Sequence, residues 1–569
     1  MVGAKAALNL MLSGAHVPAA QAAKLKLVDA VVDPSKLLDE ACSLALRMAR
    51  ENPSNAGRRL SELPCAMPTE GAALFVAARK EQAGKRRGQP AAQRIIDCVE
   101  AACTAGSFRE GLAVEQRLFK QLLGSPEANA LQHVFFAERA AAKVPGLSAQ
   151  PAKVRSVGIV GSGLMAGGIA MNFIEKGIKT VLLDREERFL AQGVAVIKQN
   201  YARSVQRGSK TQAAVDKALA LLSTTTQYVA FADVDLVIEA VFEDMPLKKE
   251  IFAQLDQHCK PGAVLASNTS FLSIDEIAGA TRRPEDVIGC HFFSPANVMP
   301  LLENVRGRKS SARTIATAQD VGSRIGKWPV LVGNCHGFVA NRMMANYGVE
   351  ARNMLMTASV SYAAIDAVAQ GKMGMPMGPF AMSDLTGLAI GVEVRKRNGT
   401  FDPERQVQDW LLEQGRQGMK NSKGWYDYAK DMKRTPSDLV AQRVVETRNK
   451  LAAGKPLRNL SDGDVFLRLC LPVINEGFRI LEEGIASRPA DIDVVLVHGY
   501  NWPRVTGGPM HQADAMGLAT VLAGLERFSK ENPKAAYFQP AQLLVDCVRA
   551  KQTLAQYWAK NAAKYTAKL

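Results

Sequence analysis

The sequence of 569 residues lacks features that mark several specialised classes of protein. It contains no run of about 18 uninterrupted apolar residues, so we expect no transmembrane helix. Its start, MVGAKAALNLMLSGAHVPAA, does not combine a charged start, an apolar run and a small-residue cleavage site, so we expect no secretory signal. The nine cysteines form no Cys-x-x-Cys pair and no zinc-spaced cluster with histidine, which predicts reduced, mostly buried thiols and no metal site.

Blocks of like charge are also scarce, although the chain is basic. It carries 71 Lys and Arg against 55 Asp and Glu, a net charge of +16. This excess is compatible with a nucleic-acid surface, a membrane surface or attraction to an anionic small molecule. The charges are scattered, and the densest run, KEQAGKRRG, has no aromatic residues beside it, so we expect no nucleic-acid partner.

The distribution of apolar residues divides the chain into parts. Residues 1–100 and 101–152 read as helices, with apolar residues at three- and four-residue spacing. Residues 153–334 alternate short β-rich runs with helical ones, which predicts an α/β domain with a parallel sheet. The remainder is helical again, and we expect two copies of one domain, at 335–440 and 458–569.

A weak internal repeat supports the two copies. AIDAV (364–368) followed by MGPFAMSDLTGL (377–388) returns as DIDVV (491–495) followed by GGPMHQADAMGL (507–518). A duplicated helical domain explains this pattern economically. The segment TRNKLAAGKPLRNLSDGD between the copies reads as their linker.

A glycine-rich turn lies at the start of the α/β part, in VGIVGSGLMAGGIA. Gly161 and Gly163 fill the first two positions of the Rossmann phosphate-binding pattern, and Ala166 fills the third. The pattern alone also fits a chance glycine turn. A strand precedes it, a helix follows, and a second strand leads into Asp184 about twenty residues on, where a carboxylate can accept both ribose hydroxyls. Because an acid there repels a 2′-phosphate, we expect NAD rather than NADP.

A histidine and a glutamate follow on neighbouring predicted strands. His291, in GCHFFSPA, lies at the end of a strand, at the sheet edge where ligands bind. Such a histidine can take a hydroxyl proton when a group such as Glu303, in PLLENV, fixes its tautomer. Taken alone, His291 fits a structural role better, and Glu303 fits a charged strand residue.

Several motifs favour a catalytic role for these two residues over a structural one, because through them the chain resembles the L-3-hydroxyacyl-CoA dehydrogenase family. The likeness is to the dehydrogenase part of peroxisomal-type bifunctional enzymes of β-oxidation, and it covers roughly residues 100 to 569. The motifs, in order, are VGIVGSGLMAGGIA, DLVIEAVFEDMPLKKEIF, SNTSFLSIDEIA, GCHFFSPANVMPLLENV, GNCHGFVANRM, KMGMPMGPFAMSDLTGL, NSKGWYDY, INEGFRILEEGIA and VHGYNWPRVTGGPM. Their order and spacing make an accidental match implausible.

The resemblance implies catalytic roles and a reaction. His291 would be the general base, Glu303 its orienting carboxylate, Ser270 a partner of the substrate hydroxyl and neighbour of the nicotinamide, and Asn341 a group that binds substrate near its reacting end. The implied reaction is NAD-dependent oxidation of (3S)-3-hydroxyacyl-CoA to 3-oxoacyl-CoA. The basic charge would help to attract the anionic acyl-CoA. His498 is expected to be structural.

The resemblance also implies cofactor contacts. Met165 would lie beside the glycine turn, and Asp184 would bind the ribose. Glu243 and Lys248 would lie on the nicotinamide side, together with Ser270. The alternative to an enzyme is a catalytically inactive scaffold protein that binds NAD and acyl-CoA.

The two ends of the chain carry further expectations. MLSGAHVPAAQAAKLKLVDAVVD resembles the end of an enoyl-CoA hydratase (crotonase) domain, so residues 1–100 would be a helical remnant without hydratase activity. A full bifunctional enzyme is the alternative if the gene sequence is truncated. The final residues, Ala567, Lys568 and Leu569, are a conservative variant of the S-K-L targeting signal that the peroxisomal import receptor recognises. We therefore expect a peroxisomal enzyme, with a bacterial cytoplasmic one as alternative, and a monomer in which the second helical copy replaces a partner subunit.

Overall fold

A computed structural model of the chain describes residues 2–51, 60–63, 65–397, 399, 401–454 and 456–566. The chain forms two compact units, Met1–Asn129 and Ala130–Leu569, and each is described by itself. Helix α7 (Pro126–Ala141) belongs to the second unit from Ala130 onward. The domain boundaries expected within these units stay predictions.

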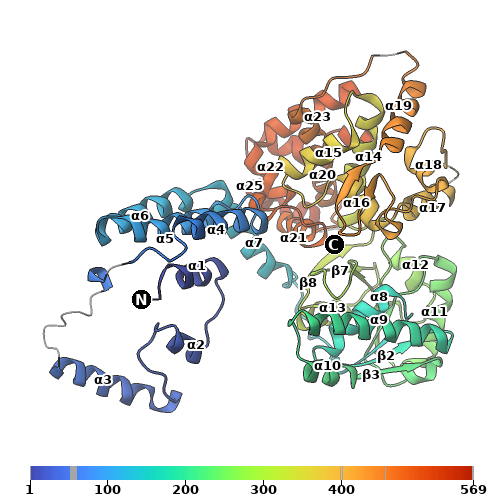
Figure 1. Cartoon of the computed structure of the whole chain (residues 1–569). Helices are drawn as coiled ribbons and strands as arrows, with labels where there is room; N and C mark the ends of the chain where they lie inside the picture. The colour runs from blue at the N-terminus through green and yellow to red at the C-terminus, as the bar shows by residue number, and fades with distance from the viewer. Residues whose placement is uncertain are drawn as a thin grey trace. The chain divides into compact units, whose positions relative to one another are not determined.

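The first unit is helical, as its sequence predicts. Its helices are α1 (Ala4–Ser13), α2 (Ala19–Lys24), α3 (Leu37–Glu51), α4 (Ala72–Lys85), α5 (Pro90–Thr104) and α6 (Phe108–Leu123) (Figure 1). A small core from α1, α4 and α5, which includes Leu8, Phe75 and Ile96, holds these three helices together. By contrast, none of the residues of α3 is buried.

The second unit contains one sheet of eight strands in the order β3-β2-β1-β4-β5-β6-β7-β8. The strands are β1 (Ser156–Val160), β2 (Lys179–Leu183), β3 (Leu222–Thr225), β4 (Leu236–Glu239), β5 (Val264–Ser267), β6 (Val287–Phe292), β7 (Leu301–Arg306) and β8 (Trp328–Gly333). Its helices are α8 (Leu164–Ile174), α9 (Glu187–Gln206), α10 (Gln212–Leu219), α11 (Met245–His258), α12 (Ile274–Ala278) and α13 (Ala312–Arg324). This arrangement confirms the Rossmann-type fold class.

The last two strands depart in direction from the expected parallel sheet, which β1 to β6 form. β7 pairs with β6 antiparallel, and β8 pairs with β7 parallel, so both run opposite to the first six. The short turn region between β6 and β7 reverses the chain without a covering helix, which is how antiparallel neighbours are joined. The edge strand β3 was not anticipated either, because its sequence, LSTT, is short and largely polar.

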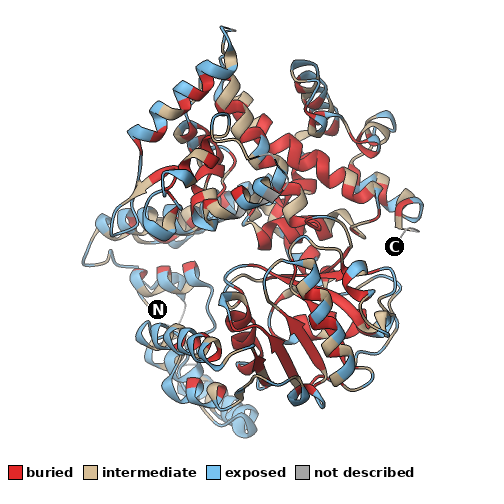
Figure 2. Ribbon diagram, turned by 90° about the vertical axis from the view of Figure 1, so that its right-hand side faces the viewer, coloured by how far each residue is buried: buried red, intermediate tan, exposed pale blue. Residues whose placement is uncertain are grey.

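Each face of the sheet packs on its own set of helices. Buried residues that alternate along the strands, such as Ile238 and Ala266, pack with α8, α9, α10 and α13 in one core. The residues between them, such as Val237 and Leu265, belong to a second core that includes α11, α12 and the C-terminal helices. Because a strand alternates its side chains with period two, one strand serves both cores. Figure 2 shows the strands buried between these layers.

Helices again form the rest of the second unit. The predicted first copy contains α14 (Ala340–Thr357), α15 (Tyr362–Gly371), α16 (Pro379–Thr386), α17 (Leu388–Arg397) and α18 (Val407–Glu413), with a small hairpin of β9 (Tyr426–Tyr428) and β10 (Arg434–Pro436), and α19 (Asp438–Ala452) begins within its range and ends beyond it. The second comprises α20 (Asp462–Glu482), α21 (Pro489–Gly499), α22 (Pro509–Met516), α23 (Leu518–Glu531), α24 (Gln542–Arg549) and α25 (Leu554–Thr566).

The repeated sequence corresponds to a repeated contact. In the first copy, the buried carboxylate of Asp366 accepts two backbone N–H groups at the start of α16, at 3.0 and 2.9 Å. In the second, Asp493 accepts two at the start of α22, at 2.7 and 3.4 Å. A Cβ atom at Gly378 would lie 2.2 Å from the Asp366 carboxylate, and one at Gly508 would lie 2.4 Å from Asp493. Both copies therefore need glycine where the acid caps the helix.

The expected linker between the copies is partly helical. Its first six residues form the last turns of α19, because Arg448 donates hydrogen bonds to the carbonyl groups of Leu355 and Val360, at 3.0 and 2.8 Å. These bonds satisfy a guanidinium that burial would otherwise penalise. Helix α19 therefore packs on the first copy rather than spanning the gap.

Three further findings concern the expected absences. Within the described ranges, no helix is long and apolar enough to cross a bilayer. The same residues contain no group of three or more His, Cys, Asp or Glu side chains that could hold a metal ion. All nine cysteines are free, but only four are buried, Cys259, Cys290, Cys470 and Cys547, so the expectation of mostly buried thiols was wrong.

Candidate active site

The centre of the candidate site is a histidine–glutamate pair across two strands. His291 on β6 and Glu303 on β7 are direct partners in the antiparallel register, so their side chains share one face of the sheet. Since Cys290 and Phe292 face the core beneath α8 and α13, His291 faces the opposite side, toward the C-terminal helices. His291 Nδ1 lies 2.7 Å from Glu303 Oε2, and both side chains are buried.

The second oxygen of Glu303 is held by a helix N-terminus. Oε1 accepts the backbone N–H groups of Val339 and Ala340, at 3.2 and 3.0 Å, where α14 begins. The unpaired N–H groups and positive dipole end of a helix stabilise a carboxylate there. Glu303 is therefore an acceptor on both oxygens, so the proton of a neutral His291 lies on Nδ1. The lone pair of Nε2 is left free to accept a proton.

Asn341 is the next residue along α14, and the structure brings it to Ser270. Its side-chain Nδ2 donates to the backbone carbonyl of Ser270 at 3.4 Å, a long hydrogen bond. Ser270 follows β5, and Asn268 in the same segment accepts the backbone N–H of Phe292 at 2.9 Å, beside the end of β6. The four expected catalytic residues therefore gather at one edge of the sheet.

The segment that carries Ser270 is fixed by Glu243. Its Oε1 accepts the hydroxyl of Thr269 at 2.6 Å and the backbone N–H groups of Ser270 and Phe271 at 2.9 and 3.0 Å. Glu243 lies after β4 and Ser270 after β5, which are neighbouring parallel strands. Glu243 thus ties together two loops at the carboxyl edge.

Lys248 lies behind Glu243 and is almost fully buried, with 1% of its surface exposed. Its Nζ donates to Glu239 Oε1 at 2.6 Å and lies 3.6 Å from Glu243 Oε2. Ser267 donates its hydroxyl to the other oxygen of Glu239, also at 2.6 Å. The ammonium is therefore paired mainly with the buried carboxylate of Glu239, and the partly exposed carboxylate of Glu243 lies farther from it.

The glycine turn has the geometry that its sequence predicts. Gly161 has φ +105°, and a Cβ there would lie 2.8 Å from the carbonyl oxygen of Ala240. Gly163 precedes α8, and nothing lies within 4 Å of its Cβ position. Met165, in the first turn of α8, packs partly buried against the core below. An exposed glycine at a helix start leaves the backbone open to a phosphate.

Asp184 follows β2 at the same edge. Its Oδ2 accepts the hydroxyl of Ser162 at 2.6 Å. Ser162 lies between the two glycines, so the turn itself orients the carboxylate. Helix α9 approaches closely here, because a Cβ at Gly193 would lie only 2.4 Å from the carbonyl oxygen of Ser162.

Sequence reasoning missed several of these residues. Ser162 and Gly193 support the glycine turn, and Glu239 anchors Lys248. Tyr500, from the second helical copy, donates its hydroxyl to Asn341 Oδ1 at 2.7 Å. The position of Ser162 inside Gly-Ser-Gly was a usable signal, whereas nothing in the sequence connects Tyr500 with Asn341.

A Rossmann sheet with a histidine–carboxylate pair at its carboxyl edge defines the class of nicotinamide-dependent dehydrogenases. Comparison with protein families agrees. Residues 156–335 match the NAD-binding domain of 3-hydroxyacyl-CoA dehydrogenase, and residues 337–428 and 463–556 match its C-terminal domain. The chain belongs to the 3-hydroxyacyl-CoA dehydrogenase family and is an NAD-dependent dehydrogenase.

Curated relatives match the whole chain. It is 37% identical over 592 residues to a peroxisomal bifunctional enzyme of Cavia porcellus, an alignment covering 100% of this chain and 80% of that protein. The Homo sapiens peroxisomal bifunctional enzyme is 37% identical over 594 residues, with the same coverage. A peroxisomal fatty acid beta-oxidation multifunctional protein of Oryza sativa is 34% identical, covering 97% of this chain and 77% of that protein.

Solved structures agree in fold. The dehydrogenase part of multifunctional enzyme 1 from C. elegans matches with a TM-score of 0.56 and 30% identity, covering 73% of this chain and 96% of that one. The 3-hydroxybutyryl-CoA dehydrogenase of Escherichia coli matches with a TM-score of 0.60 and 27% identity, covering 71% of this chain and 100% of that one.

Proposed function

We propose that this protein oxidises (3S)-3-hydroxyacyl-CoA to 3-oxoacyl-CoA in fatty acid β-oxidation, with His291 as the general base. The observation that carries the proposal is the His291–Glu303 pair, 2.7 Å apart, with Glu303 anchored on the start of α14. In this arrangement Nε2 of His291 takes the proton of the C3 hydroxyl. The Glu303 carboxylate stabilises the imidazolium that results.

Ser270 and Asn341 complete the proposed substrate site. Ser270 would hydrogen-bond the substrate hydroxyl from one side while His291 accepts its proton. Asn341 would bind the substrate near its reacting end, with the amide held against the carbonyl of Ser270. Two polar groups and one base around a single alcohol position it for reaction. The net charge of +16 favours the approach of an anionic acyl-CoA.

The residues present fit NAD. The backbone around Gly161 and Gly163, open at the start of α8, would hold the pyrophosphate beside Met165, and Asp184 would bind the adenosine ribose. Glu243 would lie at the nicotinamide side with Ser270. Because Lys248 is buried on Glu239, we propose that it positions Glu243 rather than touching the cofactor. NAD, when bound, supplies the hydride acceptor.

Formation of NADH from 3-hydroxybutyryl-CoA tests the proposal. The natural protein should turn over, and His291→Ala should lower kcat by about 10²–10⁴ because a general base is lost. His258→Ala is the matched control, since this histidine lies at the last residue of α11, where it bonds the carbonyl of Gln254 and its ring lies beside Tyr228. No turnover by the natural protein, or an undiminished rate in His291→Ala, would favour the inactive scaffold instead, for which no specific observation speaks.

Hydration of enoyl-CoA is a separate question. The relatives are named bifunctional or multifunctional enzymes, and the chain spans 80% of the length of the Cavia porcellus protein. The expected lack of hydratase activity stays a prediction, which neither the fold nor the relatives test. Loss of crotonyl-CoA absorbance on addition of the protein measures hydration directly, and robust hydration would contradict it.

Location and assembly complete the proposal. The relatives' names, peroxisomal and glyoxysomal, support a peroxisomal location and give no support to a bacterial one. The import signal, Ala567 to Leu569, lies outside the described residues. We also propose a monomer, since the helices of the second copy pack on α14 as a partner subunit's helices would. Sedimentation that reveals an obligate dimer would refute it.

A further inference from the structure

Tyr500 follows helix α21 directly and reaches the proposed substrate site from the second helical copy. Its hydroxyl donates to Asn341 Oδ1 at 2.7 Å. We infer that Tyr500 is a positioning residue for the dehydrogenase reaction, through which the second copy fixes the orientation of the Asn341 amide. This inference rests on the proposed function of Asn341, and it makes the second copy part of the site.

The two hydrogen-bond partners of Asn341 together determine the orientation of its side-chain amide. A backbone carbonyl can only accept, so the atom of Asn341 toward Ser270 is the NH₂ group. A phenol can donate or accept, so once the NH₂ group faces Ser270, Tyr500 must donate to Oδ1. Because Tyr500 holds Oδ1, the NH₂ group of Asn341 lies on the side of the amide that faces Ser270. A substrate oxygen there meets a donor.

The ring of Tyr500 is held by the strand that carries the base. It packs edge-on against Phe293, with ring centroids 6.2 Å apart at 78°, and Phe293 in turn lies 4.5 Å from the His291 ring. Gly499 allows this approach, because a Cβ there would lie 2.7 Å from Leu301 Cδ2 and 3.3 Å from Phe293. The end of α21 therefore rests on β7 and on Phe293, the residue that directly follows β6.

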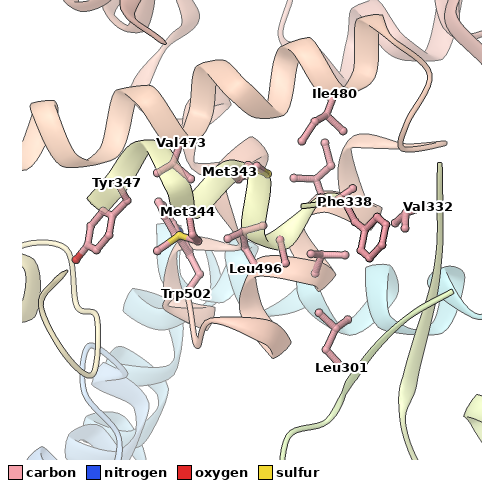
Figure 3. Packing of buried hydrophobic residues seen from close by; sticks show 14 of the residues in the cluster. Leu301, Val332, Phe338, Met343, Met344, Tyr347, Val473, Ile480, Leu496 and Trp502 are labelled. Carbon is pink, nitrogen blue, oxygen red and sulfur yellow. The ribbon is translucent and has the colours of Figure 1, made fainter. Parts of the chain in front are cut away.

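The second copy is also anchored to the last strand of the sheet. Gly333 at the end of β8 donates its backbone N–H to the carbonyl of Ile485 at 2.7 Å, and Val332 forms a bridge with Ala486. Figure 3 shows Leu301 and Val332 of the strands packed with side chains of α14, α20 and α21, including Met343, Ile480 and Leu496. This shared core keeps Tyr500 at a fixed distance from the site.

The phenol also keeps its proton. Burial raises the pKa of Tyr500, and the nearby carboxylate of Glu303 raises it further. The hydroxyl is therefore a donor throughout the neutral range, where Asn341 Oδ1 needs one.

Tyr500→Phe removes only the hydroxyl and tests the inference. We expect kcat/KM for 3-hydroxybutyryl-CoA to fall about tenfold, while the dissociation constant for NADH stays unchanged. Tyr537→Phe is the matched control, because that hydroxyl, also in the second copy, donates to Glu350 at the same 2.7 Å but serves the contact between the two copies. Tyr537→Phe should lower thermal stability and leave kcat/KM unchanged.

A double variant separates positioning from packing. If Tyr500 acts through Asn341, Tyr500→Phe should cost less than about twofold in the background of Asn341→Ala. A full tenfold loss there, an equal loss in Tyr537→Phe, or an unchanged kcat/KM in Tyr500→Phe would each overturn the inference. A natural protein that forms no NADH from the substrate would instead refute the proposed function itself.

Discussion

Glu303→Gln is the substitution that the geometry of the site defines best. Three donors converge on the two carboxylate oxygens: the Nδ1–H of His291 on one, and the backbone N–H groups of Val339 and Ala340 on the other. Glutamine offers one oxygen and one NH₂ group in the same shape. It can therefore accept from the Nδ1–H of the histidine or from the helix start, but not from both.

We expect the amide oxygen of the glutamine to face the start of α14. If the NH₂ group faced it, two buried N–H donors would be left without acceptors, at a cost of about 1–3 kcal/mol each. With the oxygen on the helix, the NH₂ group faces Nδ1, which must give up its hydrogen. The proton of the neutral imidazole then moves to Nε2, the atom that has to accept the substrate proton. The imidazolium also loses its charge-assisted bond, worth about 1.5–3 kcal/mol.

The charge-assisted bond alone accounts for about 1.5–3 kcal/mol. With the reversed tautomer, which lowers kcat by about 10⁴ in serine proteases, we expect a total loss of about 10³–10⁴ in kcat, or about 4–5.5 kcal/mol at 1.36 kcal/mol per tenfold. The assay is steady-state NADH formation, with NADH affinity measured separately and expected to be unchanged. Glu276→Gln, an exposed change on α12 beside Lys249, is the control and should leave kcat intact. A folded Glu303→Gln protein whose kcat stays within about tenfold of the natural protein would refute this tautomer argument.

Three other expectations rest on separate features. Gly161→Ala places a Cβ 2.8 Å from a backbone oxygen at φ +105°, so a fluorescence titration should find NADH bound at least about tenfold more weakly. Asp184→Ser removes the carboxylate, so the preference for NADH over NADPH should narrow in the same titration. Burial lowers the pKa of His498 beside Glu138, so the unfolded chain binds its proton more readily and stability is lost as the pH falls from 6.5 toward the lower pKa of the folded state. His498→Gln should therefore lose less stability between about pH 7 and 5.5, as urea midpoints would report.

Local rules were enough to predict the parts of the site that lie along single strands and turns. Gly161 and Asp184 follow from the spacing of a strand, a turn and a second strand. His291 and Glu303 follow from two strands whose apolar residues alternate, although only the family resemblance raised them above structural residues. The direction of β7 could not be read in this way, because alternation is the same in parallel and antiparallel neighbours.

Contacts between distant segments were beyond the sequence. Tyr500 and Asn341 are 159 residues apart, and only the packing of α21 on the sheet joins them. The family resemblance alone implied that Lys248 lies on the nicotinamide side of the cofactor, whereas the structure buries it. Its burial depends on Glu239, which reads in the sequence as an ordinary residue at the end of an apolar strand. Both cases concern polar groups whose partners are fixed by tertiary structure.

The start of α14 links the proposed base to the proposed substrate contact. Its first N–H groups hold Glu303, and the next residue, Asn341, carries the amide that Tyr500 orients. Farther along, α14 packs on α20 so closely that a Cβ at Gly477 would lie 3.1 Å from Met343 Cε. Since a close-packed interior transmits displacement, we expect a bulkier residue at Gly477, unlike the loss of a single hydroxyl, to shift the start of α14 and with it the proposed base and substrate contact. If the proposed roles hold, the second copy sets the geometry of the site through α14 as well as through Tyr500, which would give a physical reason for keeping both copies in one chain.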